Sequence, residues 1–147
     1  MRSLVYFGLA LPVVTFAACV AVAADASDDF YSQFVVGHYE LIGKRPDGTA
    51  TYQGQVSIFR GQKSLGVRRT INGQVVEGSA AFEAAPRAET RVLRMRFTDR
   101  GTSYECTCLV QGDLDNYARL TCHRYRQDGG TRQPGLEALF PTGADRW

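Results

Sequence analysis

Apolar and polar residues alternate with a period of two along most of the chain from residue 34 onward. This period is typical of a β-strand that buries one of its two faces. It predicts seven strands, at residues 34–44, 50–60, 65–71, 74–83, 92–98, 104–110 and 118–126. Residues 136–140 are a weaker candidate for an eighth strand, which Pro134 restricts to an edge or closing position. No helical period follows residue 24.

Turn-forming sequences between these segments indicate that consecutive strands form hairpins. The Asn-Gly pair between the third and fourth strands favours a type I′ turn, whose register places Arg68 opposite Glu77. The Arg-Pro-Asp-Gly sequence between the first two strands is typical of a type I turn. A four-residue turn there predicts that Leu41 lies opposite Tyr52.

Consecutive hairpins without helical crossovers imply an antiparallel up-and-down meander. A meander of seven or eight strands with one apolar face removes its exposed edges best by closing into a small barrel. We therefore predict an all-β fold, a closed barrel of seven or eight strands. The alternative is a sandwich of two sheets.

The start of the chain has the features of a targeting segment. Arg2 precedes an apolar run that begins at Leu4, and Ala21-Val22-Ala23 forms an A-x-A cleavage site. We predict a cleaved signal peptide at 1–24, an acidic linker at 25–33, the barrel domain at 34–141 and a tail at 142–147.

A second interpretation of the leader rests on Phe16-Ala17-Ala18-Cys19, which resembles a bacterial lipobox. In that case Cys19 would carry lipid, and the protein would be an outer-membrane lipoprotein. Otherwise we expect a periplasmic or secreted protein. The formal net charge of +2 is too small to indicate nucleic acid or an anionic membrane surface as a partner. Membrane contact is expected only through a lipid on Cys19.

Three cysteines lie beyond the leader: Cys106, Cys108 and Cys122. Export to an oxidising compartment predicts one disulfide, with the third thiol buried as a small apolar group. A five-residue loop at 112–116 brings Cys106 opposite Cys122, which is the pairing that we predict. A shift of two residues gives the alternative, Cys108 with Cys122. A zinc site needs four ligands and a better spacing than C-x-C, so we expect no metal.

Residues 37–43, 46–48 and 52–58 follow the pattern G-x-[YW]…P-D-G-x-x-Y-x-G-x-V-x-I. In this pattern the chain resembles a group of exported bacterial β-meander proteins that are uncharacterised. Their motif ends in a Gly-x-Glu-x-Leu-x-Pro-like segment, whose counterpart here is 135–141. Gly37-x-Tyr39 also resembles the G-x-W that opens lipocalin barrels. The likeness to lipocalin- or streptavidin-type barrels implies the fold but no activity.

Catalytic patterns are missing from the sequence. It has no G-x-S-x-G elbow and no complete phosphate loop. His38 and His123 lie on different predicted strands without a serine or cysteine pattern beside them. We therefore expect neither an enzyme nor a bound cofactor.

The interior of the barrel offers one candidate binding site. Arg69 falls on the inner face, where it could hold the head group of an anionic amphipathic ligand. The wall of such a pocket would be formed by Tyr39, Tyr52, Ile71 and Val76. Arg69 also suits a rim position with its guanidinium in water, and we favour that interpretation. The small inner residues Gly54 and Gly78 then serve packing.

The outer face offers a second candidate, a patch for another protein formed by Arg94, Arg96, Glu105, His123 and Tyr125. The simpler interpretation of this patch is an ordinary polar surface. These features predict an exported, non-enzymatic binding protein that holds a small amphipathic ligand or caps another exported protein as an inhibitor would. The alternative is a structural, envelope-associated barrel without a small-molecule site.

Overall fold

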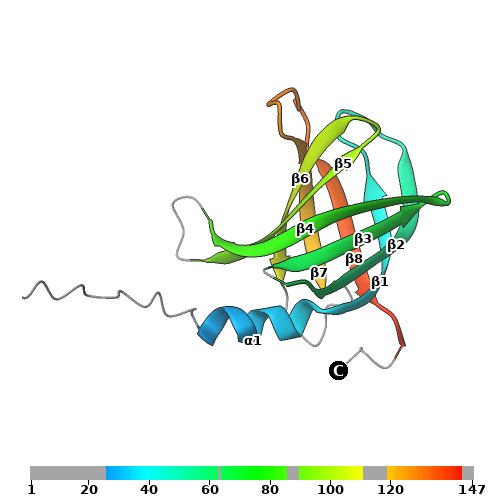
Figure 1. Cartoon of the computed structure of the whole chain (residues 1–147). Helices are drawn as coiled ribbons and strands as arrows, with labels where there is room; N and C mark the ends of the chain where they lie inside the picture. The colour runs from blue at the N-terminus through cyan, green and yellow to red at the C-terminus, as the bar shows by residue number, and fades with distance from the viewer. Residues whose placement is uncertain (1–25, 63, 86–89, 111–118, 144–147) are drawn as a thin grey trace, which may run out of the picture.

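The computed structural model describes residues 26–62, 64–85, 90–110 and 119–143. One helix precedes eight strands: α1 (Ala26–Val35), β1 (Gly37–Lys44), β2 (Thr51–Arg60), β3 (Leu65–Ile71), β4 (Gln74–Ala84), β5 (Arg91–Asp99), β6 (Thr102–Val110), β7 (Leu120–Arg126) and β8 (Gly135–Pro141). The strands pair in sequence order, and β8 returns to β1, so the sheet is a closed antiparallel barrel (Figure 1). The predicted up-and-down barrel is thus confirmed. The leader and Cys19 lie outside the described residues.

The weak eighth strand is the one that closes the barrel. Leu139 lies opposite Leu41 of β1 on one side and opposite Leu120 of β7 on the other. Pro134 directly precedes β8, so its missing N–H costs the sheet no hydrogen bond. Closure leaves every strand with two neighbours, which removes the exposed edges of the sheet.

The prediction that no helix follows the leader was wrong, because residues 26–35, including most of the predicted acidic linker, form helix α1. Phe30, Tyr31, Phe34 and Val35 recur at helical spacing, and this short pattern was the signal that we missed. Val35 is buried in the barrel core, while the Tyr31 ring contacts Phe82 with 5.4 Å between centroids. The helix therefore lies across one end of the barrel (Figure 1). Within the described ranges, no helix has the length and apolar content to cross a bilayer.

Hairpin registers follow the sequence where the turn is tight. Arg68 lies opposite Glu77, as the Asn-Gly turn predicts. The β1–β2 hairpin differs: Gly43, not Leu41, lies opposite Tyr52. The connection between these strands is longer than a four-residue turn, because Asp47 in it has another role. Its Oδ1 accepts hydrogen bonds from two backbone N–H groups of the β7–β8 connection, at 2.9 and 2.8 Å.

The disulfide joins Cys108 and Cys122, so the predicted pairing of Cys106 with Cys122 was wrong and the alternative pairing is the one observed. Cys108 lies directly opposite Cys122, and Cys106 lies opposite Arg124. The first β6–β7 pair is Val110 with Leu120, so the connection is longer than the five-residue loop that our prediction assumed. The predicted turn at 112–116 lies outside the described residues. Cys106 is a buried free thiol, as the odd number of cysteines indicated.

We predict that non-reducing peptide mapping finds Cys108 linked to Cys122. Their separation of 14 positions closes a loop of the size that stabilises a fold by on the order of 3 kcal/mol in the chain-entropy model. The Cys122→Ala variant should lose about this much free energy of unfolding. Cys106→Ala is the control, because it keeps the cross-link. A peptide containing Cys106 linked to Cys122 would contradict the pairing.

Candidate functional site

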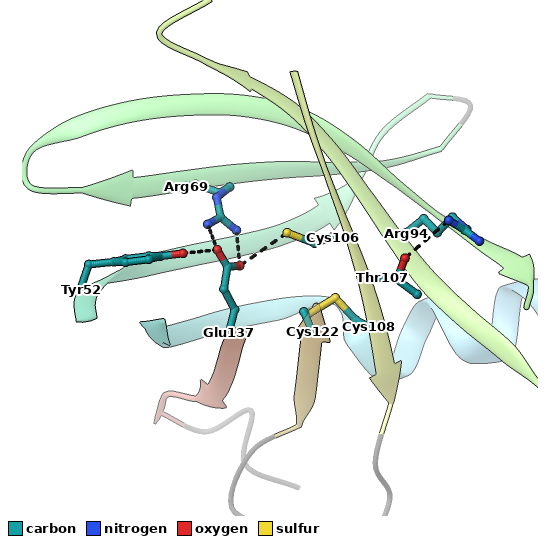
Figure 2. The surroundings of a disulfide bond; sticks show 8 residues. All are labelled: Tyr52, Arg69, Arg94, Cys106, Thr107, Cys108, Cys122 and Glu137. Carbon is teal, nitrogen blue, oxygen red and sulfur yellow. Dashed lines mark hydrogen bonds and ion pairs between the residues drawn. A yellow bond between two sulfur atoms is a disulfide. The ribbon is translucent and has the colours of Figure 1, made fainter. Parts of the chain in front are cut away.

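A buried ion pair connects opposite walls of the barrel. Arg69 of β3 and Glu137 of β8 are 1% and 3% exposed. The guanidinium donates two hydrogen bonds to the carboxylate, at 2.9 and 2.6 Å, in the bidentate arrangement that makes such pairs strong (Figure 2). Arg69 is therefore not a rim residue in water, so the favoured sequence-based interpretation of it was wrong, and its charge is paired with Glu137 inside the protein.

The sequence of β8 places the carboxylate inside. Gly135, Glu137 and Leu139 share the inner face of the strand, and all three are buried. The partners of Glu137 in the neighbouring strands are Gly43 and Cys122, which are both small. A Cβ atom at Gly43 would lie 2.7 Å from the Tyr52 ring, so glycine is needed for that ring to lie beside Glu137.

Two further side chains complete the hydrogen bonding of Glu137. The Tyr52 hydroxyl donates to its Oε1 atom, and the Cys106 thiol donates to Oε2 at 3.7 Å (Figure 2). Burial by itself would raise the pKa of Glu137, but the charge of Arg69 and the hydrogen bonds from Arg69 and Tyr52 hold it below its usual range. A buried carboxylate that is ionised and paired in this way is a structural group rather than a proton donor.

The neighbours of the carboxylate are held in their neutral forms. Burial, reinforced by Glu137, raises the pKa of the Tyr52 hydroxyl and raises that of the Cys106 thiol well above its usual range. A thiol must ionise to act as a nucleophile or a metal ligand. Cys106 therefore lacks the activation that either role requires.

A second guanidinium lies beside this pair. Arg124 of β7 is 3% exposed, and it stacks over the Tyr104 ring with 3.9 Å from its Cζ atom to the centroid. Its Nη1 atom donates to the Tyr52 hydroxyl at 3.3 Å and lies 3.7 Å from Glu137 Oε1. We refer to Arg69, Glu137, Tyr52, Arg124 and Cys106 as the interior cluster. Sequence reasoning missed both Glu137 and Arg124, although each follows from the alternation within its strand.

The predicted ligand pocket is mostly filled. A cavity of about 20 Å³ remains at the end of the barrel that carries the Asn72-Gly73 turn. The structure brings Tyr52, Ile71 and Val76 to this cavity, as predicted. Tyr39 is not among its lining residues, because its hydroxyl donates at 2.7 Å to the carbonyl of Val35, at the end where α1 lies. A space of this size holds about one water molecule, not an amphipathic ligand.

The small inner glycines serve packing. A Cβ atom at Gly54 would lie 2.5 Å from the Thr70 carbonyl oxygen, and one at Gly78 would lie 2.2 Å from the Arg96 carbonyl oxygen. These contacts are with backbone atoms, so no side chain could move aside. The glycines permit close approach of adjacent strands and leave no room for a ligand.

The predicted outer patch divides into two parts. Arg96 donates to Glu83 at 2.6 Å and to Glu105 at 2.9 Å, while Arg94 also pairs with Glu105. The hydrogen bond from Arg96 holds the pKa of Glu83 below its usual value. These ion pairs neutralise most of the charge that the patch was expected to present. His123 and Tyr125 lie together on β7, with 3.3 Å between Nδ1 and the hydroxyl.

Beside these residues, a hollow of about 720 Å³ crosses the outer face of the barrel. Two rows of directly paired residues line it. One row is Thr51, Lys44, Leu136, His123, Thr107 and Arg94; the other is Ile42, Ala138, Thr121 and Leu109. Tyr125 also lines the hollow, which we call the outer groove. Thus Arg94, His123 and Tyr125 of the predicted patch come together here, whereas Arg96 and Glu105 lie in the ion-pair network.

Comparisons with known proteins add no assignment: no protein-family model matches the chain, and no curated protein is similar to it. Among the residues that the structure describes, no group of three or more His, Cys, Asp or Glu side chains could hold a metal ion. The candidate sites are therefore the outer groove and the mouth of the barrel next to the interior cluster.

We predict that the two members of the buried pair are not equivalent. Glu137→Gln leaves Arg69 and Arg124 without their shared carboxylate, and loss of one buried partner typically costs about 3–5 kcal/mol. Arg69→Met should cost less, because Arg124 remains 3.7 Å from Glu137. Urea unfolding of both variants measures the difference. Equal losses would show that Arg124 does not compensate.

A pH dependence follows from the lowered pKa of Glu137. The unfolded state takes up a proton at a higher pH than the folded state, so this residue stabilises the fold above pH 4.5, its ordinary pKa. That contribution is lost as the pH falls through the lower folded-state pKa. The stability gap between the natural protein and Glu137→Gln should therefore shrink below pH 4.5.

The control for this measurement is Glu83→Gln. The pKa of Glu83 is also lowered, through the hydrogen bond from Arg96, but this carboxylate is partly exposed to water. The difference in stability between the natural protein and Glu83→Gln should be smaller across the whole pH range, because solvent screens the pair of Glu83 and Arg96. A gap for Glu137→Gln that stays constant down to pH 3 would contradict the assigned role of the ionised carboxylate (pH 3 being roughly one unit below an ordinary Glu pKa).

Proposed function

We propose that this chain is an exported, non-enzymatic binding protein that holds another exported protein in the outer groove. The observation that carries the proposal is the apolar lining of that groove. Ile42, Leu136 and Leu109 stand on three different strands and are 48%, 46% and 49% exposed. Exposed aliphatic side chains grouped around a hollow are typical of protein-binding surfaces.

The form of the groove favours an extended, mainly apolar segment of the partner. Its floor is made of short side chains, Ala138, Thr121 and Thr107, and the aliphatic side chains stand beside them. Lys44 contributes positive charge near one end of the first row, whereas the charge of Arg94 at the other end is paired with Glu83 and Glu105. An apolar segment flanked by an acidic residue would match this distribution.

The filled interior supports a surface function over a small-ligand function. The barrel mouth has about 20 Å³ of free space, against about 720 Å³ in the outer groove. The disulfide is compatible with the oxidising compartment that the leader predicts. A rigid cross-linked barrel would present the groove in one fixed shape, which lowers the entropy cost of binding.

The test compares two arginine substitutions. Ala138→Arg places a long charged side chain on the groove floor and leaves the inner face unchanged. Val75→Arg is the matched control, because Val75 is an exposed apolar residue on β4, which does not line the groove. Partner retention during purification from the native compartment should fall at least about tenfold in Ala138→Arg only, the effect of losing roughly 1.4 kcal/mol.

Equal retention by all three proteins would overturn the groove as the binding site. A structural barrel without a partner would give no stoichiometric co-purifying protein in any of them. A small molecule found by mass spectrometry of the same preparations without any co-purifying protein is the outcome expected if the alternative ligand-binding function is right.

A further inference from the structure

The guanidinium of Arg124 is incompletely hydrogen-bonded. A guanidinium carries five N–H donors, and a buried one normally finds acceptors for most of them. Among the described residues, its hydrogen-bond partner is the Tyr52 hydroxyl, at 3.3 Å. Its Nε atom is buried without an acceptor. Its Nη atoms lie 3.7 and 3.8 Å from the carboxylates of Glu137 and Asp99, beyond hydrogen-bond distance.

Arg124 also lines the cavity at the barrel mouth, so an incompletely hydrogen-bonded side chain borders free space. Exposed residues, Asn72, Gln74 and Arg100, share the lining of this cavity, and the cavity therefore reaches the surface. Its volume of about 20 Å³ suits one small polar group. A larger ligand would have to keep the rest of its structure outside the barrel.

The charge around the cavity favours an anion. Four arginines line it: Arg45, Arg69, Arg100 and Arg124. Two carboxylates face them: Glu137 accepts both hydrogen bonds of Arg69 and lies 3.7 Å from Arg124, while Asp99 lies 3.8 Å from Arg124. Four guanidinium charges thus face two carboxylates. Arg100 donates to the neutral Gln74 at 3.2 Å, so this contact does not reduce its charge. The mouth thus carries an excess of positive charge beside an underbonded buried guanidinium.

We propose that the mouth of the barrel binds a carboxylate group on Arg124. A carboxylate is planar and accepts two parallel hydrogen bonds from a guanidinium. The surrounding arginines, Arg45 and Arg100, attract it from solution. Ile71, Val76 and Phe97 give the mouth apolar walls, against which the first carbon atoms of the ligand pack. The site is distinct from the outer groove, so the two can be tested separately.

The anion would thus lie on a different residue from the one that the sequence suggested. The charge of Arg69 is used inside the protein, whereas Arg124 has donors to spare. The apolar part of the ligand also lies differently, at the mouth rather than along Tyr39 within the barrel.

The experiment uses three probes with the full-length mature protein in a chloride-free buffer. Sodium decanoate offers a carboxylate on an alkyl chain, 1-decanol offers the same chain without charge, and sodium acetate offers the carboxylate almost alone. Titration calorimetry should detect decanoate below its micellar concentration and no binding of decanol. Binding of acetate as well would indicate a free small carboxylate as the ligand; binding of decanoate alone would indicate a longer-chain acid.

Two variants and one control locate the site. Arg124→Met keeps an unbranched, flexible side chain and removes the donors, so decanoate binding should weaken at least about tenfold. The Arg45→Gln, Arg100→Gln double variant leaves the interior cluster unchanged, and its binding should weaken severalfold and depend less on salt. Arg68→Gln, an exposed arginine of β3 that pairs with Glu77, should bind like the natural protein.

The proposal is overturned if the natural protein binds neither carboxylate, or if decanol binds as tightly as decanoate. It is also overturned if folded Arg124→Met binds decanoate normally. Should Arg124→Met fail to fold, the double variant decides, because unchanged binding there would exclude the mouth as the site.

Discussion

The fold depends on neutralising charge inside a barrel too small to admit water freely. Arg69 and Glu137 face each other from β3 and β8, which are not neighbours in the sheet. Their two hydrogen bonds therefore connect opposite walls, whereas the backbone hydrogen bonds connect only adjacent strands. An isolated charge in this interior would cost several kcal/mol, so each of these side chains needs a buried partner of opposite charge. Strand β8 thus closes the barrel both through its backbone and through Glu137.

The buried pair limits what the protein can do with its interior. Arg69, Tyr52 and Cys106 donate hydrogen bonds to the Glu137 carboxylate. Backbone atoms lie so close to Gly54 and Gly78 that the barrel wall has no space for a Cβ atom at either position. A barrel of eight strands has an interior that side chains can just fill, and here they fill it. The binding sites that we propose are accordingly at two other places: the outer groove, and the mouth where the Nε atom of Arg124 has no acceptor.

The alternation of residues was sufficient to predict the barrel, because a period of two determines both strand and face. Tight turns were sufficient for register, as the pairing of Arg68 with Glu77 shows. Longer connections were not. The segment around Asp47 serves the β7–β8 connection as well as its own hairpin, and a partner so far along the chain cannot be inferred from local turn chemistry.

The interior cluster was predictable only in part, for a geometric reason. The phase of alternation in 135–139 and in 120–124 places Glu137 and Arg124 on the inner face, and closer attention to it would have found both. The contact between Glu137 and Arg69 could not be found in this way. Sequence patterns identify neighbours within a sheet, but residues that meet across the interior of a barrel are related only through strand tilt and curvature.

The two ends of the barrel are chemically different, and the order of the strands explains why. Helix α1 enters β1 at one end, where Val35 is buried and its carbonyl accepts a hydrogen bond from Tyr39. In an up-and-down barrel, the connections after β1, β3, β5 and β7 must then lie at the opposite end. Those connections supply Arg45, Asn72 and Arg100 to the mouth. One end is therefore covered by apolar contacts with the helix, and the other presents arginines to solvent. This polarity places the proposed carboxylate site at the end of the barrel opposite α1, where Arg124 lines the cavity.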